Sequence, residues 1–152
     1  MTFIKKHLGV CVLFLLFTLG ATKAQAQFGV YFTNNVIPAE QKDGYTEPAL
    51  QGGFYHDQGF YEIMEGSNYF SLSDSPSSIA IQFWNYSGYY WYYGNQGVGG
   101  YINLKVYDYN DEIIYDETQY IGPYDWTYGA GLASFTGVPT SGDIEITTST
   151  TN

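Results

Sequence analysis

The sequence predicts an all-β protein built as an antiparallel β-sandwich, and three features of the 152-residue chain support this fold class. First, apolar residues alternate with others in short runs such as 79–83 (IAIQF) and 102–106 (INLKV), which is typical of half-buried strands. Second, Gly, Pro, Asn, Asp and Ser separate such runs at intervals of about 8–14 residues. Third, no segment combines a helical hydrophobic period with capping residues.

The first 26 residues have the features of a signal peptide. Lys5 and Lys6 precede an apolar run over 9–20, and the small residues Ala24 and Ala26 then frame a cleavage site. The apolar run is short for a membrane span. We therefore expect a secreted, periplasmic or cell-surface bacterial protein that is not inserted in the membrane after cleavage. The exported part is expected to lack cysteine, because the one Cys of the chain lies within the apolar run.

After the leader, residues 27–50 are expected to form an N-terminal strand at 28–33 and a polar connection. The β-sandwich domain is expected to span 51–148. In order, the patterns in this domain predict a hairpin at 52–61, strands at 69–72 and 79–84, a Tyr-rich strand around 89–93, a strand at 102–108 paired with 112–115, an aromatic loop at 122–131, and closing strands at 132–136 and 144–148.

The exported part is strongly acidic. It contains two lysines, Lys42 and Lys105, against 15 Asp and Glu, which makes a formal charge of −13 with His56 neutral. Such a surface repels phosphate backbones and anionic lipid, so neither nucleic acid nor a membrane is expected as a partner. The charge would serve solubility, and it would also attract cations such as Ca²⁺.

Residues that support catalysis are scarce. His56 is the one histidine after the leader, and no G-x-S-x-G sequence accompanies it. A transition-metal site would require several His or Cys ligands. A glycoside hydrolase remains an alternative, since such enzymes use a pair of carboxylates. The candidates for that pair are Glu62, Glu65, Asp116 and Glu117. A non-catalytic protein is nevertheless expected.

The most distinctive feature is the aromatic content, 17 Tyr and three Trp. In the run 89–93 (YYWYY), strand alternation would place Tyr90 and Tyr92 on the face opposite to their neighbours, and a two-layer sandwich buries only one face. Exposed rings beside amide and carboxylate groups suit sugars, and they suit protein surfaces equally well. A Tyr-lined edge strand is the structural alternative. The candidate ligand-binding residues are Trp84, Tyr90, Tyr92, Asn95, Gln96, Asp125 and Trp126.

Calcium is the candidate cofactor. Asp108, Asn110 and Asp111 place several oxygen ligands in one predicted turn, and Asp74 is a further candidate ligand. The turn lacks the glycine and the distant glutamate of an EF-hand loop. Solvated carboxylates at a hairpin tip are the alternative interpretation.

Two copies of the pattern Y-x-[DN]-Q-G-[FV] start at Tyr55 and Tyr93, and Gly100 follows the second copy. Over about residues 54–104 the chain thereby resembles the Greek keys of βγ-crystallins. Residues 74–78 (DSPSS) also look like the calcium signature of that family, which implies calcium-site positions at Asp74 and Ser77. The chain departs from the pattern at several positions, including Val98 in place of the second aromatic.

Residues 68–146 carry a second resemblance. The strand pattern S-P-S-S-I-A-I-Q-F, an aromatic loop, I-N-L-K-V-Y-D-Y-N-D-E, and then F-T-G-V-P with I-E-I follow one another. This order is similar to that of secreted bacterial jelly-roll sandwiches, including galactose-binding-like carbohydrate modules. The resemblance implies a non-catalytic protein that binds a glycan or another extracellular surface through an aromatic face. The alternatives are a self-associating surface or matrix protein and a βγ-crystallin-like calcium-binding protein.

Overall fold

The computed structural model describes residues 26–151, so residues 1–25 of the predicted signal peptide lie outside the described part. The described residues form eleven strands and one short 3-10 helix. In chain order these are β1 (Ala26–Thr33), β2 (Glu40–Lys42), β3 (Tyr45–Glu47), β4 (Leu50–His56), β5 (Gly59–Ile63), β6 (Gly66–Leu72), β7 (Ile79–Asn85), η1 (Trp91–Tyr93), β8 (Gly100–Tyr107), β9 (Ile113–Ile121), β10 (Gly131–Val138) and β11 (Asp143–Ser149). Within this range, no helix is long and apolar enough to cross a membrane.

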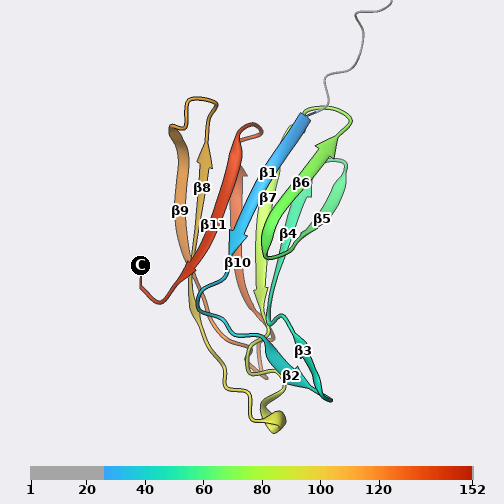
Figure 1. The fold of residues 1–152 in the computed structure, drawn as a ribbon, viewed down its shortest axis with the longest axis vertical. Helices are drawn as coiled ribbons and strands as arrows, with labels where there is room; N and C mark the ends of the chain where they lie inside the picture. Colours follow the sequence, from blue (N-terminus) through green and yellow to red (C-terminus); the bar gives the residue numbers. More distant parts are fainter. Residues whose placement is uncertain (1–25, 152) are drawn as a thin grey trace, which may run out of the picture.

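The strands form two packed sheets and a small hairpin, which confirms the predicted β-sandwich (Figure 1). One sheet has the order β6-β1-β11-β8-β9, and the other has the order β10-β7-β4-β5. Strand pairs are antiparallel except β1 and β11, which run parallel with Val30 opposite Ile144. The predicted N-terminal strand therefore lies inside the five-stranded sheet, between β6 and β11.

The core lies between the two sheets and consists of residues that alternate along the strands. On β7, Ile79, Ile81 and Phe83 face inward and are buried, while the residues between them are partly exposed. Strand β8 repeats this pattern from the other sheet with Ile102, Leu104 and Val106. Period-two burial on both inner faces is what the alternation in the sequence predicts.

Most predicted elements are confirmed, and two are wrong. The hairpin at 52–61 is β4–β5, and the strands predicted at 102–108 and 112–115 pair as β8 and β9. The predicted polar connection after β1 instead contains the β2–β3 hairpin. The predicted strand around 89–93 is a turn followed by η1, because the chain reverses between Gly88 and Gly94, both of which have positive φ.

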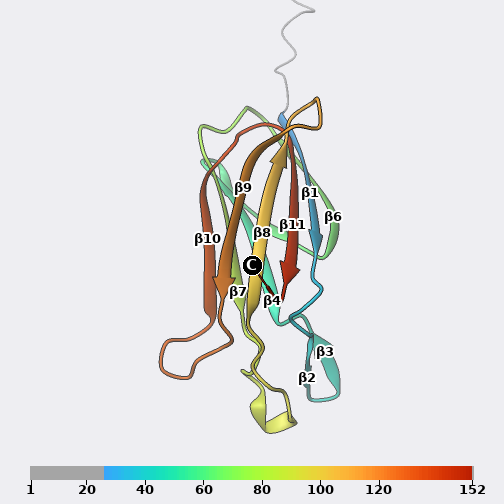
Figure 2. The ribbon, with the colours of Figure 1, turned by 90° about the vertical axis from the view of Figure 1, so that its left-hand side faces the viewer.

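The loops divide into two groups at opposite ends of the sandwich (Figures 1 and 2). The β2–β3 hairpin, the long β7–β8 connection containing η1 and the β9–β10 loop lie together at the lower end of both views. The turns that carry Asp57, Asp74 and Asp108 lie at the upper end. The aromatic residues of the β7–β8 and β9–β10 connections therefore lie at the opposite end from the predicted calcium ligands.

Along one side, a glutamine side chain joins the two sheets. The Gln119 side-chain amide donates a hydrogen bond to the Ser134 carbonyl oxygen (2.8 Å) and accepts one from the Ser134 backbone N–H (2.9 Å). These bonds connect β9 to β10, which are the edge strands of the two different sheets. They satisfy backbone groups that an exposed edge would offer to another chain.

Candidate functional site

The β7–β8 connection leaves the sandwich through a neck of buried polar side chains. Asn85 and Ser87 are fully buried, and each donates a side-chain hydrogen bond to the Val98 carbonyl oxygen (2.8 and 2.7 Å). The Ser87 hydroxyl also accepts a hydrogen bond from the Val98 N–H (2.8 Å). Since buried polar groups are costly unless paired, these bonds hold both ends of the connection together.

A buried carboxylate stabilises the turn that follows this neck in the β7–β8 connection. Glu40, at the start of β2, is only 3% exposed, and its carboxylate accepts hydrogen bonds from the backbone N–H groups of Gly88 and Tyr90. Asn95 connects the same two elements, because its side-chain amide donates hydrogen bonds to the carbonyl oxygens of Gln41 (2.9 Å) and Tyr90 (3.1 Å). The β2–β3 hairpin and the aromatic connection are thus one hydrogen-bonded unit.

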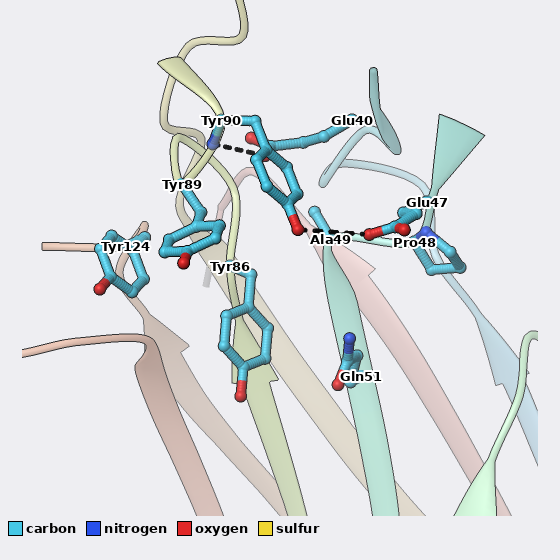
Figure 3. Close-up of a pocket in the computed structure, with 9 residues that line it drawn as sticks. All are labelled: Glu40, Glu47, Pro48, Ala49, Gln51, Tyr86, Tyr89, Tyr90 and Tyr124. Carbon is cyan, nitrogen blue, oxygen red and sulfur yellow. Dashed lines mark hydrogen bonds between the residues drawn. The ribbon is translucent and has the colours of Figure 1, made fainter. Parts of the chain in front are cut away.

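Between these elements lies a pocket of about 450 Å³ (Figure 3). The rings of Tyr86, Tyr89 and Tyr124 lie on one side of it, and Glu47 and Gln51 lie on the other. The residues that line the pocket are Glu40, Glu47, Pro48, Ala49, Gln51, Tyr86, Tyr89, Tyr90 and Tyr124. They come from three segments that are distant in sequence.

Tyr90 lies between the two carboxylates of the pocket (Figure 3). Its hydroxyl donates a long hydrogen bond to Glu47 (3.5 Å), and the ammonium of Lys42 lies 5.1 Å from the centre of its ring. The same ammonium is 3.5 Å from the Glu47 carboxylate. The Tyr90 hydroxyl and then the charge of Glu47 raise the pKa of Lys42 above its ordinary value.

Further rings surround Tyr89. Trp126, from the β9–β10 loop, stacks on Tyr89 with the ring centres 5.5 Å apart and the planes 20° apart. Tyr124 meets both rings edge to face, at 4.8 Å from Tyr89 and 5.2 Å from Trp126. Trp126 is 62% exposed, so its outer face is available to a ligand.

The outer face of the four-stranded sheet continues from the pocket. Trp84 on β7 is the register partner of the pocket residue Gln51 and lies 6.1 Å from the ring of Tyr55. Tyr55 in turn packs 5.0 Å from Phe60, and both rings lie over Gly53, where a Cβ would be within 3 Å of each. The pocket is thus one end of a longer row of aromatic side chains.

The predicted ligand-binding residues take different positions relative to this pocket. Tyr90 lines it, while Trp84 and Trp126 border it. Tyr92 is 61% exposed at the tip and packs on Tyr93, at 4.2 Å between ring centres. The remaining three are polar: Asn95 supports the loop, Gln96 is exposed, and the Asp125 carboxylate accepts hydrogen bonds from the N–H groups of residues 127 and 128 in its own loop.

Sequence reasoning missed Glu47, Gln51, Tyr86, Tyr89 and Tyr124 as site residues. Glu47 lies in the stretch predicted to be a plain connection, and Gln51 follows it on β4. Tyr89 stands in the aromatic run, but strand alternation placed it on the face opposite to Tyr90, whereas both residues line the pocket. Nothing local to these residues indicates that they converge.

The predicted calcium ligands lie at the other end of the sandwich. The Asp108 carboxylate accepts hydrogen bonds from the N–H groups of Asn110 (2.8 Å) and Glu112 (3.0 Å), so it already stabilises its own turn. Asp74 lies in the separate β6–β7 loop, where Ser77 donates two hydrogen bonds to Asp57. Over residues 26–151, no three His, Cys, Asp or Glu side chains are grouped to hold a metal ion. Calcium binding stays a prediction.

The Asp108 turn predicts a pH dependence of stability. The N–H groups of Glu112 and Asn110 hold the pKa of Asp108 below its ordinary value of 3.8. A carboxyl group with a lowered folded-state pKa stabilises the protein above the unfolded pKa, and this contribution is lost as the pH falls through the folded pKa. Asp108→Asn should therefore lower the urea midpoint at neutral pH, with a difference from wild type that shrinks below about pH 4. Glu112→Gln, in the same turn, should change the midpoint less at every pH, and equal changes would contradict the assignment.

The two Y-x-[DN]-Q-G-[FV] copies differ in structure. The first forms the β4–β5 hairpin turn, whereas the second runs from the end of η1 into the irregular segment before β8. The expectation of a second Greek-key hairpin at this position is therefore wrong. No protein-family model, curated protein or solved structure matches this chain, so neither resemblance is supported by a relative.

Proposed function

We propose that this chain is an exported, non-catalytic glycan-binding β-sandwich whose site is the pocket at the loop end. The observation that carries the proposal is the lining of this pocket, which combines several tyrosine rings with the Glu47 carboxylate and the Gln51 amide. Ring faces stack on the C–H faces of sugars, while carboxylates and amides accept and donate hydrogen bonds to hydroxyl groups. The buried neck and Glu40 hold these groups in place before a ligand arrives, which reduces the entropic cost of binding.

The length of the aromatic row supports an oligosaccharide as the ligand. Gln51 in the pocket and Tyr55 further along β4 are four residues apart, about 13 Å at strand spacing. Trp84 stands opposite Gln51 on the neighbouring strand, and its ring lies 6.1 Å from that of Tyr55. A chain of sugar units could therefore occupy the pocket with one unit and pass over Trp84 with the next.

The carboxylates of the pocket support binding in preference to hydrolysis. Glycosidases use two carboxyl groups that flank the scissile bond. Here Glu40 is buried and both of its oxygens accept hydrogen bonds from backbone N–H groups, so it is committed to the turn. Glu47 then remains as the one carboxylate that can meet a sugar from within the pocket.

A glycan array followed by titration calorimetry on the best oligosaccharide tests the proposal. Tyr89→Ala should weaken that binding by about tenfold or more, the usual effect of removing a central aromatic contact. Tyr109→Ala is the matched control, because Tyr109 is 93% exposed and belongs to the β8–β9 turn at the other end of the sandwich. Absence of binding to every glycan by the folded protein, or equal losses in the two variants, would refute the proposal.

A further inference from the structure

The pocket carries negative charge without a cation of its own. Its lining includes Glu40 and Glu47 and no Lys, Arg or His. The nearest cation is Lys42, whose ammonium lies outside the lining but contacts Tyr90 and Glu47 at the rim. Only one other lysine, Lys105, occurs in residues 26–151, on β8 of the opposite sheet. With two carboxylates in the lining and one lysine at the rim, an anionic ligand would meet net repulsion in this pocket.

The position of Lys42 shows how the pocket rim holds an ammonium group. The group lies over the face of the Tyr90 ring, where the ring quadrupole attracts cations, and within ion-pair distance of Glu47. Aromatic faces recur in sites that bind ammonium ligands, and a carboxylate beside the ring adds a charge-assisted hydrogen bond. The Lys42 side chain is 38% exposed and has a flexible four-carbon stem, so an ammonium group of a ligand can compete for its position.

We infer that the glycan bound in this pocket bears free amino groups, so that a charged amino-sugar unit takes the position beside Tyr90 and Glu47 that the Lys42 ammonium holds in the free protein. This inference rests on the proposed glycan-binding function and names its ligand class. Such a sugar presents C–H faces to Tyr86 and Tyr89 and an ammonium to Glu47. The strongly acidic surface of the chain would also attract the polycation over distance.

A lysine-rich peptide carries the same ammonium chemistry, and the geometry of the sheet favours the sugar. The row from Gln51 to Tyr55 lies on a strand that is paired on both sides, with β5 and with β7. An extended peptide laid on this face would therefore find no free backbone groups with which to pair. A sugar chain does not require them.

Titration calorimetry with two matched probes tests the inference. The probes are a tetramer of β-1,4-linked glucosamine and the same tetramer with every amine acetylated, compared at low salt and about pH 6, where amines are charged and carboxylates are ionised. The free-amine tetramer should bind at least about tenfold more tightly, and added salt should reduce the difference. Glu47→Gln should bring the two affinities close together, while Glu145→Gln, the same charge change on the other sheet, should preserve the difference. Lys42→Met removes the competing ammonium and retains a side chain of similar length, so it should increase the preference for the free amine.

Each remaining outcome overturns the inference. If both tetramers bind equally, the pocket binds glycans but does not select amines, and the proposed function still stands. If Glu47→Gln retains the full preference, the amine is not selected by Glu47, and the placement of the ammonium beside Tyr90 and Glu47 is wrong. If a tetralysine peptide binds as tightly as the free-amine tetramer, the ligand is not specifically a sugar. If neither tetramer nor any other glycan binds the folded protein, the proposed function fails together with the inference.

Discussion

Phe83→Ala is expected to lower the free energy of unfolding by about 3–5 kcal/mol, the usual cost of removing a fully buried phenylalanine ring. Phe83 has no exposed surface, and its ring packs 5.0 Å from that of Phe32 in the opposing sheet. Its register partners on the two neighbouring strands are Gly52 and Ala133, which leave room for the ring. A Cβ on Gly52 would lie 2.6 Å from the Phe83 ring, so the ring packs directly on Gly52, which has no side chain to fill the cavity.

Urea unfolding followed by tryptophan fluorescence measures this loss. Small domains are stable by about 5–15 kcal/mol, so Phe83→Ala could leave a considerable fraction of the molecules unfolded. Phe60→Ala is the matched control, because Phe60 belongs to the same sheet but is 53% exposed on its outer face. The control should lose about 1 kcal/mol or less. Equal losses in the two variants would show that the core is not where the structure places it.

Gly131→Ala is the second substitution with a large expected effect. Gly131 begins β10, and a Cβ at this position would overlap the carbonyl oxygen of Gly122, which directly follows β9. Because this contact is with backbone, relief requires the two strand ends to separate. We expect a destabilisation of about 1–3 kcal/mol or more. The β9–β10 loop would shift as well, and glycan binding should weaken because this loop carries Tyr124 and Trp126.

Gly122→Ala provides the control at the facing glycine. A Cβ at Gly122 would meet only the ring of Tyr120, at an ordinary 3.9 Å, so this variant should unfold close to wild type. Thermal unfolding and glycan titration of both variants make the comparison. If Gly122→Ala proves the more damaging of the two, the close approach of the strand ends is not as described.

The sequence by itself determined the fold class and most of the strands. Alternation of apolar residues at 79–83 and 102–106 reports directly that one face of each strand is buried, because a strand directs successive side chains to opposite sides. Turn residues similarly marked the β4–β5 and β8–β9 connections. These features depend on neighbours in the chain, so a single sequence contains them.

Tertiary structure alone decided where the site lies. Residues 89–93 have the composition of a strand, yet Glu40, about fifty residues earlier, binds the backbone N–H groups of Gly88 and Tyr90 and holds the chain in a turn. The same long-range pairing brings Glu47 and Gln51 to face Tyr89 across the pocket. The parallel pairing of β1 with β11, near the two ends of the described chain, is equally non-local. Period and propensity carry no information on such contacts, because they arise only when the two sheets and their loops pack together.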